Sequence, residues 1–310
     1  MRVLIAEQDH ANYARLLGEA APDLEVLTSG DSAELARYAP DCPVWLGQPD
    51  LLASLLRQGH QPAWVQSTWA GITPLLGDGL PRDYRLTRAV GIFGQVMAEY
   101  MLTYMLIHER DVLSRLVSQV ERRWDGRPGH GLEGREVLIV GTGDIGQRVA
   151  EFLAPFGVTL RGVASSAREQ APFVEVAGLA ELPRLVTQAD YVLNLLPDTP
   201  ATHDLYDASL FRRFKPSAQF INAGRGVAVV DADLVEALKQ GHLASAVIDV
   251  CRQEPLPQRH PFWTAWGLLL TGHSSAPTSP VAMVRLFVEN VRAYQAGEGL
   301  RGEVDFQRGY

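Results

Sequence analysis

The chain has 310 residues, of which 46% are hydrophobic and 21% charged, so it is long enough for two ordinary domains and is not a disordered segment. Its net charge of −8 argues against a nucleic-acid-binding surface, which needs clustered positive charge. Cys42 and Cys251 form no paired motif, so we expect a reducing compartment and no thiolate metal site. No stretch is typical of a signal peptide or a membrane span, so we expect a soluble, cytoplasmic protein with no membrane partner.

The first third of the chain alternates strand and helix patterns. Short apolar runs predict buried strands at Arg2–Ala6, Pro43–Gly47 and Ala63–Gln66. Helical composition predicts helices at Ala11–Ala20 and Ser32–Tyr38. This alternation predicts a parallel sheet covered by helices on both faces.

A long stretch without proline predicts one helix over 94–124 that is apolar nearly all round. Two interpretations stay open: a helix of the core, or a helix that packs against a second subunit. A polar, glycine-rich loop follows, and the alternation of strands and helices resumes at Val137. A last helix is expected after Ser279, with Pro280 at its first position and a buried stripe of Val281, Val284, Val288 and Val291.

The strand that begins at Val137 runs directly into the pattern GxGxxG, which a helix follows. Gly141 permits the tight turn, Gly143 lets a pyrophosphate approach the backbone, and Gly146 allows the helix to pack on the strand. This context favours a dinucleotide site over a structural turn. We expect the segment to bind the cofactor through Gly141, Gly143, Asp144, Ile145 and Gly146, with the Asp144 carboxylate directed away from the phosphates.

The next strand, Val158–Ala164, is not followed by the acidic residue that grips the adenosine ribose of NAD. It is followed by Ser165, Ser166 and Arg168, which can bind a 2′-phosphate. We therefore predict that NADP(H) is preferred. The alternative is an ordinary polar turn and a protein that uses NAD(H).

Three later segments each end a predicted strand with a residue suited to catalysis. They supply Arg225, Glu254 and His273. The carboxyl ends of parallel strands are where open α/β sheets bind ligands, so we expect these side chains to meet. Taken one at a time, each has a plainer interpretation: a solvated arginine, a charge at the rim, and an ordinary histidine.

Together these motifs resemble the D-isomer-specific 2-hydroxyacid dehydrogenases, most closely their glyoxylate/hydroxypyruvate reductase A branch. The matching features are the glycine motif, Leu195-Leu-Pro197 with Thr199 and Thr202, Asn222-Ala-Gly-Arg-Gly226, Asp249 with Glu254-Pro255, and His273. The resemblance implies an α/β fold of two doubly wound parallel-sheet lobes. Residues 96–277 would form a Rossmann coenzyme domain, and residues 1–95 with 278–310 a discontinuous, flavodoxin-like substrate domain. It also implies a homodimer.

The resemblance assigns the chemistry to the three strand-end residues. Arg225 would bind the carboxylate of a 2-oxo acid and polarise its carbonyl group. His273 would protonate the carbonyl oxygen, and Glu254 would favour the protonated imidazole. Gly272 and Ser274-Ser275 flank the histidine where the family usually has proline before it and a hydrophobic residue and alanine after it.

Further positions carried over from the family would bind cofactor or substrate. The expected cofactor-binding residues are Leu196, Pro197 and Thr202, the carbonyl group of Ala223, and the carboxylate of Asp249. The expected substrate-binding residues are Arg225, the backbone N–H groups of Ala70 and Gly71, and Trp45. For Trp45 and the neighbouring Trp69, packing in a core is an equal alternative.

The predicted function is NADPH-dependent reduction of small 2-oxo acids such as glyoxylate and hydroxypyruvate. One alternative keeps the fold and makes the chain an NAD-dependent dehydrogenase of a larger D-2-hydroxy acid. Another makes it a nucleotide-sensing binding protein of the same fold, but the basic patches and long extensions that regulatory partners use are missing from the sequence. No metal is expected in the site.

Overall fold

The computed structural model describes residues 1–307 and 309, so Arg308 and Tyr310 of the predicted substrate domain lie outside the described residues. The chain divides into two compact units. Unit 1 comprises Met1–Ile92 and Thr278–Tyr310, and unit 2 comprises Phe93–Pro277. The chain leaves unit 1 three residues before the predicted boundary and returns to it at the predicted position.

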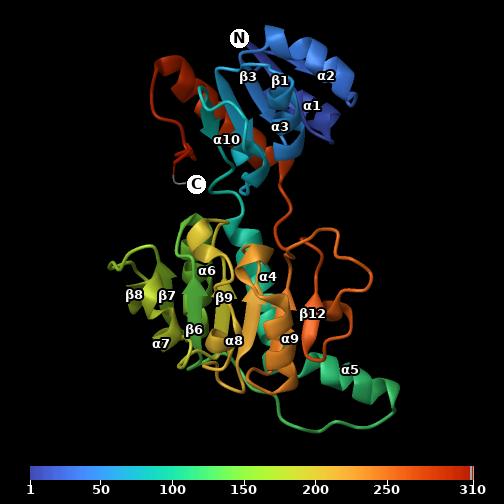
Figure 1. Cartoon of the computed structure of the whole chain (residues 1–310), viewed down its shortest axis with the longest axis vertical. Coiled ribbons are helices and arrows are strands. Elements are labelled where there is room, and N and C mark those ends of the chain that lie inside the picture. The colour runs from blue at the N-terminus through green and yellow to red at the C-terminus, as the bar shows by residue number, and fades with distance from the viewer. Residues whose placement is uncertain (308, 310) are drawn as a thin grey trace. The chain divides into compact units, whose positions relative to one another are not determined.

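Unit 1 is built on a parallel sheet with the strand order β2-β1-β3-β4-β5 (Figure 1). This is the order of flavodoxin-like doubly wound folds, as predicted. The strands are β1 (Arg2–Ala6), β2 (Glu25–Thr28), β3 (Val44–Gly47), β4 (Trp64–Ser67) and β5 (Arg85–Thr87). The helices are α1 (His10–Ala20), α2 (Ser32–Tyr38), α3 (Pro49–Arg57) and α10 (Pro280–Ala296).

Unit 2 has a larger parallel sheet with the order β12-β11-β10-β9-β6-β7-β8. The strand order reverses between β6 and β9, and this is the Rossmann arrangement with β12 added at one edge. The strands are β6 (Glu136–Val140), β7 (Thr159–Ala164), β8 (Glu175–Gly178), β9 (Tyr191–Asn194), β10 (Gln219–Asn222), β11 (Ser245–Ile248) and β12 (Leu268–Leu270). The helices are α4 (Gly94–Glu109), α5 (Val112–Val120), α6 (Asp144–Leu153), α7 (Leu182–Leu185), α8 (Ala208–Phe211) and α9 (Asp231–Lys239).

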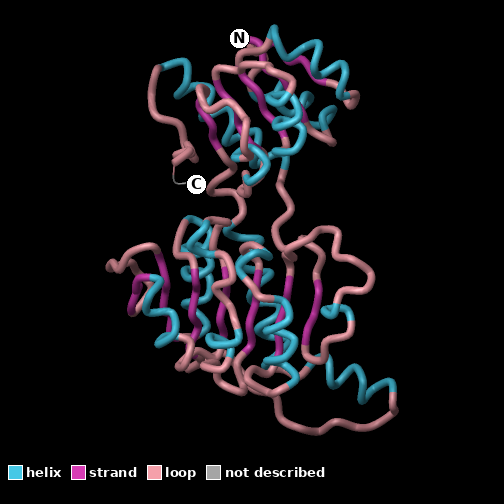
Figure 2. Tube along the Cα trace, in the orientation of Figure 1, coloured by secondary structure: helices cyan, strands magenta, loops and turns pink. Residues whose placement is uncertain are grey.

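Short 3-10 helices complete the two units. They occupy Ala39–Asp41, Thr73–Leu76, Ala154–Phe156, Leu179–Glu181, Pro200–Thr202, Gly226–Ala228 and Pro261–Trp263. In each unit the strands run side by side with helices packed over them (Figure 2). Among the described residues, no helix combines the length and apolar character that crossing a bilayer requires.

The central strand β6 shows why the sheet of unit 2 is buried on both faces. Its side chains alternate between two apolar cores: Leu138 and Val140 face the core under α7, α8 and α9, whereas Val137 and Ile139 face the core under α4 and α6. A strand covered on both faces needs an unbroken apolar run, because successive side chains point to opposite sides. The sequence of β6 has this run.

The single helix predicted over 94–124 is wrong, because the structure has two helices there. Helix α4 ends at Glu109, and α5 begins at Val112. Between them Asp111 has a left-handed backbone with φ of 51°, which aspartate tolerates better than most residues and which ends the first helix. The buried side of α4, including Met101 and Met105, packs in the core of unit 2, which favours the core-helix interpretation for α4.

The last helix begins as predicted, since the Ser279 hydroxyl accepts a hydrogen bond from the N–H of Ala282 and Pro280 follows it. Its predicted stripe is wrong at one position, because Val281 is 56% exposed. The most buried residues of α10 are Met283 and Phe287. Val281 lies two residues before Met283, a rotation of roughly 200° about the helix axis, so it points away from the sheet.

Candidate active site

The three predicted strand-end residues come from adjacent strands of unit 2. Arg225 follows β10, Glu254 follows β11 and His273 follows β12, and these strands are neighbours in the order β12-β11-β10. The parallel sheet therefore brings their carboxyl ends to one edge, as expected. Nδ1 of His273 lies 2.7 Å from Oε2 of Glu254, and about half of the imidazole side chain is exposed.

The His273–Glu254 pair favours a protonated imidazole. The hydrogen bond to Glu254, together with its negative charge, raises the pKa of His273. Burial raises the pKa of Glu254, but hydrogen bonds from His273 and from the N–H of Cys251 outweigh burial, so that this pKa is lowered overall. The nearby Arg225 cation lowers the pKa of Glu254 further and offsets part of the rise in the pKa of His273. The net effect is a raised pKa for the imidazole, which favours its acid form.

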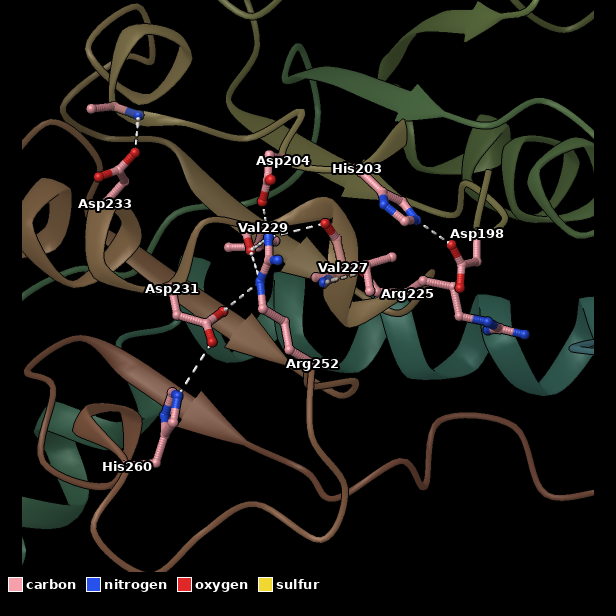
Figure 3. Close-up of polar contacts among 12 residues, drawn as sticks. Asp198, His203, Asp204, Arg225, Val227, Val229, Asp231, Asp233, Arg252 and His260 are labelled. Carbon is pink, nitrogen blue, oxygen red and sulfur yellow. Dashed lines mark hydrogen bonds and ion pairs between the residues drawn. The ribbon is translucent and has the colours of Figure 1, made fainter. Parts of the chain in front are cut away.

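Arg252 lies on the loop of Glu254 and forms hydrogen bonds with the loop of Arg225 (Figure 3). Its guanidinium group donates hydrogen bonds to the carbonyl groups of Val227, at 3.0 Å, and Val229, and it pairs with Asp204. The loops approach so closely that a Cβ atom on Gly226 would lie 2.0 Å from the backbone of Cys251, so only glycine fits there. Figure 3 shows Arg225 directed away from this group of contacts.

Two buried asparagines fix the loop of Arg225 through hydrogen bonds. Nδ2 of Asn194, at the end of β9, donates to Oδ1 of Asn222, at the end of β10, over 2.9 Å. Asn222 also accepts from the N–H of Gly224 and donates to the carbonyl group of Arg225, at 3.2 Å each. Neither amide is exposed, so the turn that presents Arg225 is fixed by satisfied buried hydrogen bonds.

The glycine motif has the geometry that a bound dinucleotide requires. Gly141 has φ of 108°, and a Cβ on Gly146 would lie 2.0 Å from the carbonyl oxygen of Gly141. At Gly143 a Cβ would meet nothing within 4 Å, which leaves open space beside the first turn of α6, where Asp144 and Ile145 lie. A helix N-terminus next to open space fits a pyrophosphate group.

Arg168 lies against this loop. Its guanidinium group donates to Oγ1 of Thr142, between the first two glycines, over 2.7 Å and to Oε1 of Gln170 over 2.7 Å. Ser165 and Ser166 are exposed directly after β7. The residues predicted to bind a 2′-phosphate therefore surround the carboxyl end of β7, beside the glycine motif.

The other predicted cofactor residues differ in accessibility. Pro197 is exposed, whereas Leu196 and Ala223 are 8% and 7% exposed. Thr202 is buried, and its hydroxyl donates to the carbonyl oxygen of Pro197 over 2.8 Å, which makes it a support for the turn at Pro197. Asp249 is 1% exposed, and its carboxylate accepts hydrogen bonds from the loop that carries His273.

In unit 1, Trp45 and Trp69 differ in burial. Trp45 lies within β3 and has no exposed surface, and its indole N–H donates to the carbonyl oxygen of Cys42 over 2.9 Å. Core packing accounts for Trp45, and the predicted contact with substrate does not fit this burial. Trp69, beyond the end of β4, is 40% exposed and is followed by the partly buried Ala70 and Gly71.

Sequence reasoning missed a buried carboxyl group at this edge of unit 1. Oε1 of Glu7, directly after β1, accepts a hydrogen bond of 2.5 Å from the hydroxyl of Thr68, directly after β4. Burial raises the pKa of Glu7. Glu7 directly follows the strand predicted at Arg2–Ala6, but Thr68 lies two residues beyond the strand predicted at Ala63–Gln66, so only Glu7 stood at a predicted strand end.

Comparison with known proteins shows the family of this chain. Residues 102–275 match the model of the D-isomer specific 2-hydroxyacid dehydrogenase NAD binding domain. The chain belongs to the D-isomer specific 2-hydroxyacid dehydrogenase family and is an oxidoreductase. It is 33% identical to glyoxylate/hydroxypyruvate reductase A of Photorhabdus laumondii over 97% of both chains.

Solved structures extend the similarity over the whole fold. A family member from Aeromonas salmonicida is 38% identical, with a TM-score of 0.92 over 98% of this chain and 99% of that one. The NADPH-dependent glyoxylate/hydroxypyruvate reductase of Sinorhizobium meliloti, solved with NADP and sulfate, is 27% identical, with a TM-score of 0.87 over 100% and 99%.

Proposed function

We propose that this protein reduces glyoxylate and hydroxypyruvate to their 2-hydroxy acids with NADPH. The observation that carries the proposal is the His273–Glu254 pair, with Arg225 on the neighbouring strand, in the same unit as the glycine motif. Relatives named for this activity match nearly the whole chain. When bound, NADPH supplies the hydride that adds to the 2-oxo carbon.

The residues of the chain then have distinct tasks. Arg225 binds the substrate carboxylate, which its planar guanidinium group matches. His273 donates its proton from Nε2 to the carbonyl oxygen as negative charge develops there. The Glu254 carboxylate accepts the hydrogen bond from Nδ1–H of His273, so the proton transferred to the substrate is the one on Nε2. The proposed reaction is tested by the initial rates of NADPH and NADH oxidation, each with glyoxylate and with hydroxypyruvate.

The role of Glu254 can be tested by pH dependence. Glu254 raises the pKa of His273, so reduction should fall as pH rises through that raised pKa. Glu254→Gln removes the charge, and the fall in kcat/KM should then begin at a lower pH. The measurement is kcat/KM for glyoxylate against pH in both proteins. An unchanged upper limb of the profile in the variant would contradict the assignment.

Cofactor preference can be tested at Arg168. Arg168→Gln should lower kcat/KM for NADPH about 10- to 100-fold, because a charge-assisted contact with the 2′-phosphate is lost, and should leave NADH nearly unchanged. Arg184→Gln, on the exposed side of α7 and paired with Glu181, is the matched control. Equal losses with both cofactors would show that Arg168 only holds the glycine loop.

We also propose that the protein is a homodimer that associates through α5. This helix and the loop after it project from unit 2 (Figure 1). They expose a helical stripe of large apolar side chains: Leu113, Leu116, Val117, Val120 and Trp124. Trp124 is 95% exposed, and monomers rarely leave such a stripe in water. A second copy is the partner that fits, because the same stripe on both subunits forms a self-complementary interface.

The dimer can be tested by sedimentation. Wild-type protein should sediment as two chains at micromolar concentration, and Leu116→Asp should shift it toward one chain. Val174→Asp, at a 63% exposed valine outside α5, should leave the mass unchanged. A wild-type protein that sediments as a single chain would overturn this part of the proposal.

A further inference from the structure

His273 has an uncommon backbone conformation that something must hold in place. Its φ is 56°, and the φ of the preceding Gly272 is 66°. Residues other than glycine seldom adopt this left-handed region. Such a conformation persists only where the surroundings fix it, and it is typical of functional sites. The contacts around this loop therefore fix the backbone that carries the imidazole.

Asp249, at the end of β11, holds three successive residues of the loop. Its carbonyl oxygen accepts from the N–H of His273 over 2.6 Å. Its carboxylate accepts from the N–H of Ser274 over 2.8 Å and from that of Ser275 over 3.2 Å. Because Asp249 is only 1% exposed, water cannot easily replace these contacts.

A second pair of residues fixes the carboxylate itself. The hydroxyl of Thr271 donates to Oδ1 of Asp249 over 2.6 Å, and the hydroxyl of Tyr100, on α4, lies 2.8 Å from the same Thr271 oxygen. Since the one proton of Thr271 goes to Asp249, the proton of this second bond comes from Tyr100. Burial raises the pKa of Tyr100, which keeps the phenol protonated as a donor.

We infer that Tyr100, Thr271 and Asp249 form a positioning chain that sets the orientation of His273 for proton transfer. The inference rests on the proposed role of His273 as the general acid. The positioning chain runs from Tyr100 on α4 to Thr271, directly after β12, and to Asp249, directly after β11. Asp249 then holds the backbone on both sides of the imidazole. Tyr100 and Thr271 act through the loop and are not placed in contact with substrate.

Thr271→Val tests the inference, because it keeps the shape of the side chain and removes the hydroxyl. We expect kcat for glyoxylate reduction to fall between about 10- and 100-fold, since a small misplacement of a catalytic group has effects of this size. KM for glyoxylate and Kd for NADPH, measured by fluorescence, should change less than threefold. The solvent deuterium isotope effect on kcat should increase, because proton transfer becomes the slower step. Thr271→Ser keeps the hydroxyl and should restore most of the turnover.

Tyr100→Phe tests the far end of the chain, with Tyr104→Phe as its matched control on the same helix. The two rings are in edge contact, with centroids 4.7 Å apart, but the Tyr104 hydroxyl is not a member of the chain. Tyr100→Phe should lower kcat several-fold, and Tyr104→Phe should not. Adding Tyr100→Phe to Thr271→Val should cost little more, because the link is already broken.

Three results would overturn the inference. One is a kcat for Thr271→Val within twofold of wild type. Another is a Thr271→Ser variant as slow as Thr271→Val, which would show that the hydroxyl does not matter. The third is a large rise in Kd for NADPH in Thr271→Val, with kcat preserved at saturating NADPH. This result would show that the positioning chain supports the cofactor site instead of His273. Failure of the proposed function is distinguishable, because it would appear as no glyoxylate reduction by the wild-type protein, and failure of the role of His273 would appear as normal turnover when His273 itself is replaced.

Discussion

Replacing His273 with asparagine is expected to lower kcat for 2-oxo acid reduction by roughly 10²- to 10⁴-fold, the usual contribution of a general acid. The carbonyl oxygen gains negative charge as hydride arrives, and without the imidazole no residue of the described chain is assigned to protonate it. Asparagine keeps a polar side chain that can still meet Glu254 and tolerates the left-handed backbone at this position. Kd for NADPH should therefore stay within a few-fold of wild type.

His203→Asn is the matched control for this prediction. His203 is also paired with a carboxylate, since its Nε2 lies 2.6 Å from Oδ1 of Asp198, and it is about half exposed like His273 (Figure 3). Its replacement should leave kcat within twofold. Near-normal turnover in His273→Asn would remove the histidine from the mechanism.

Arg225→Lys is expected to lower kcat/KM by about 10²- to 10³-fold, because lysine keeps the charge and loses the planar, two-pronged recognition of a carboxylate. Most of the loss should appear in KM for glyoxylate. The upper limb of the pH profile should move little, because a positive charge still lies near His273. Initial rates over a range of glyoxylate and pH give both quantities.

Two observations complete the test at Arg225. Arg213→Lys, an exchange at an exposed arginine of the same unit, should leave kcat/KM unchanged. Kd for NADPH should also stay unchanged in Arg225→Lys, since the arginine is assigned to the substrate. A variant with normal KM for glyoxylate would contradict the assignment of the carboxylate to Arg225.

Much of unit 2 could be predicted because its signals are local. A strand, three glycines and a helix occupy eighteen consecutive residues from Glu136 to Leu153, and the structure has them in that order. The gathering of Arg225, Glu254 and His273 followed from one rule about parallel strands. Neither step required knowledge of contacts between distant parts of the chain.

The errors arose where two arrangements share one local pattern. The end of α4 carries neither glycine nor proline, so the sequence does not indicate that the helix ends before Asp111, whose backbone is left-handed. Trp45 and Trp69 look alike in sequence, but Trp45 lies inside β3, which helices cover on both sides, and Trp69 lies beyond β4. The position of each indole, inside a covered strand or beyond the end of one, decides which of them is buried.

The supports of the site were not predictable, because they join residues far apart in sequence. Arg252 reaches Asp204 and the carbonyl groups near Arg225, and Tyr100 reaches the loop of His273 from α4. No short motif encodes such a contact. Each becomes visible only when the sheet has placed the ends of its strands side by side.

The most direct test of the proposed reaction is the initial rate of NADPH and NADH oxidation by the wild-type protein, each with glyoxylate and with hydroxypyruvate. We expect rapid oxidation with both substrates and a higher kcat/KM with NADPH. Preference for NADH would keep the reaction and contradict the role of Ser165, Ser166 and Arg168. Tight NADPH binding without turnover of either substrate would contradict the proposed reaction itself.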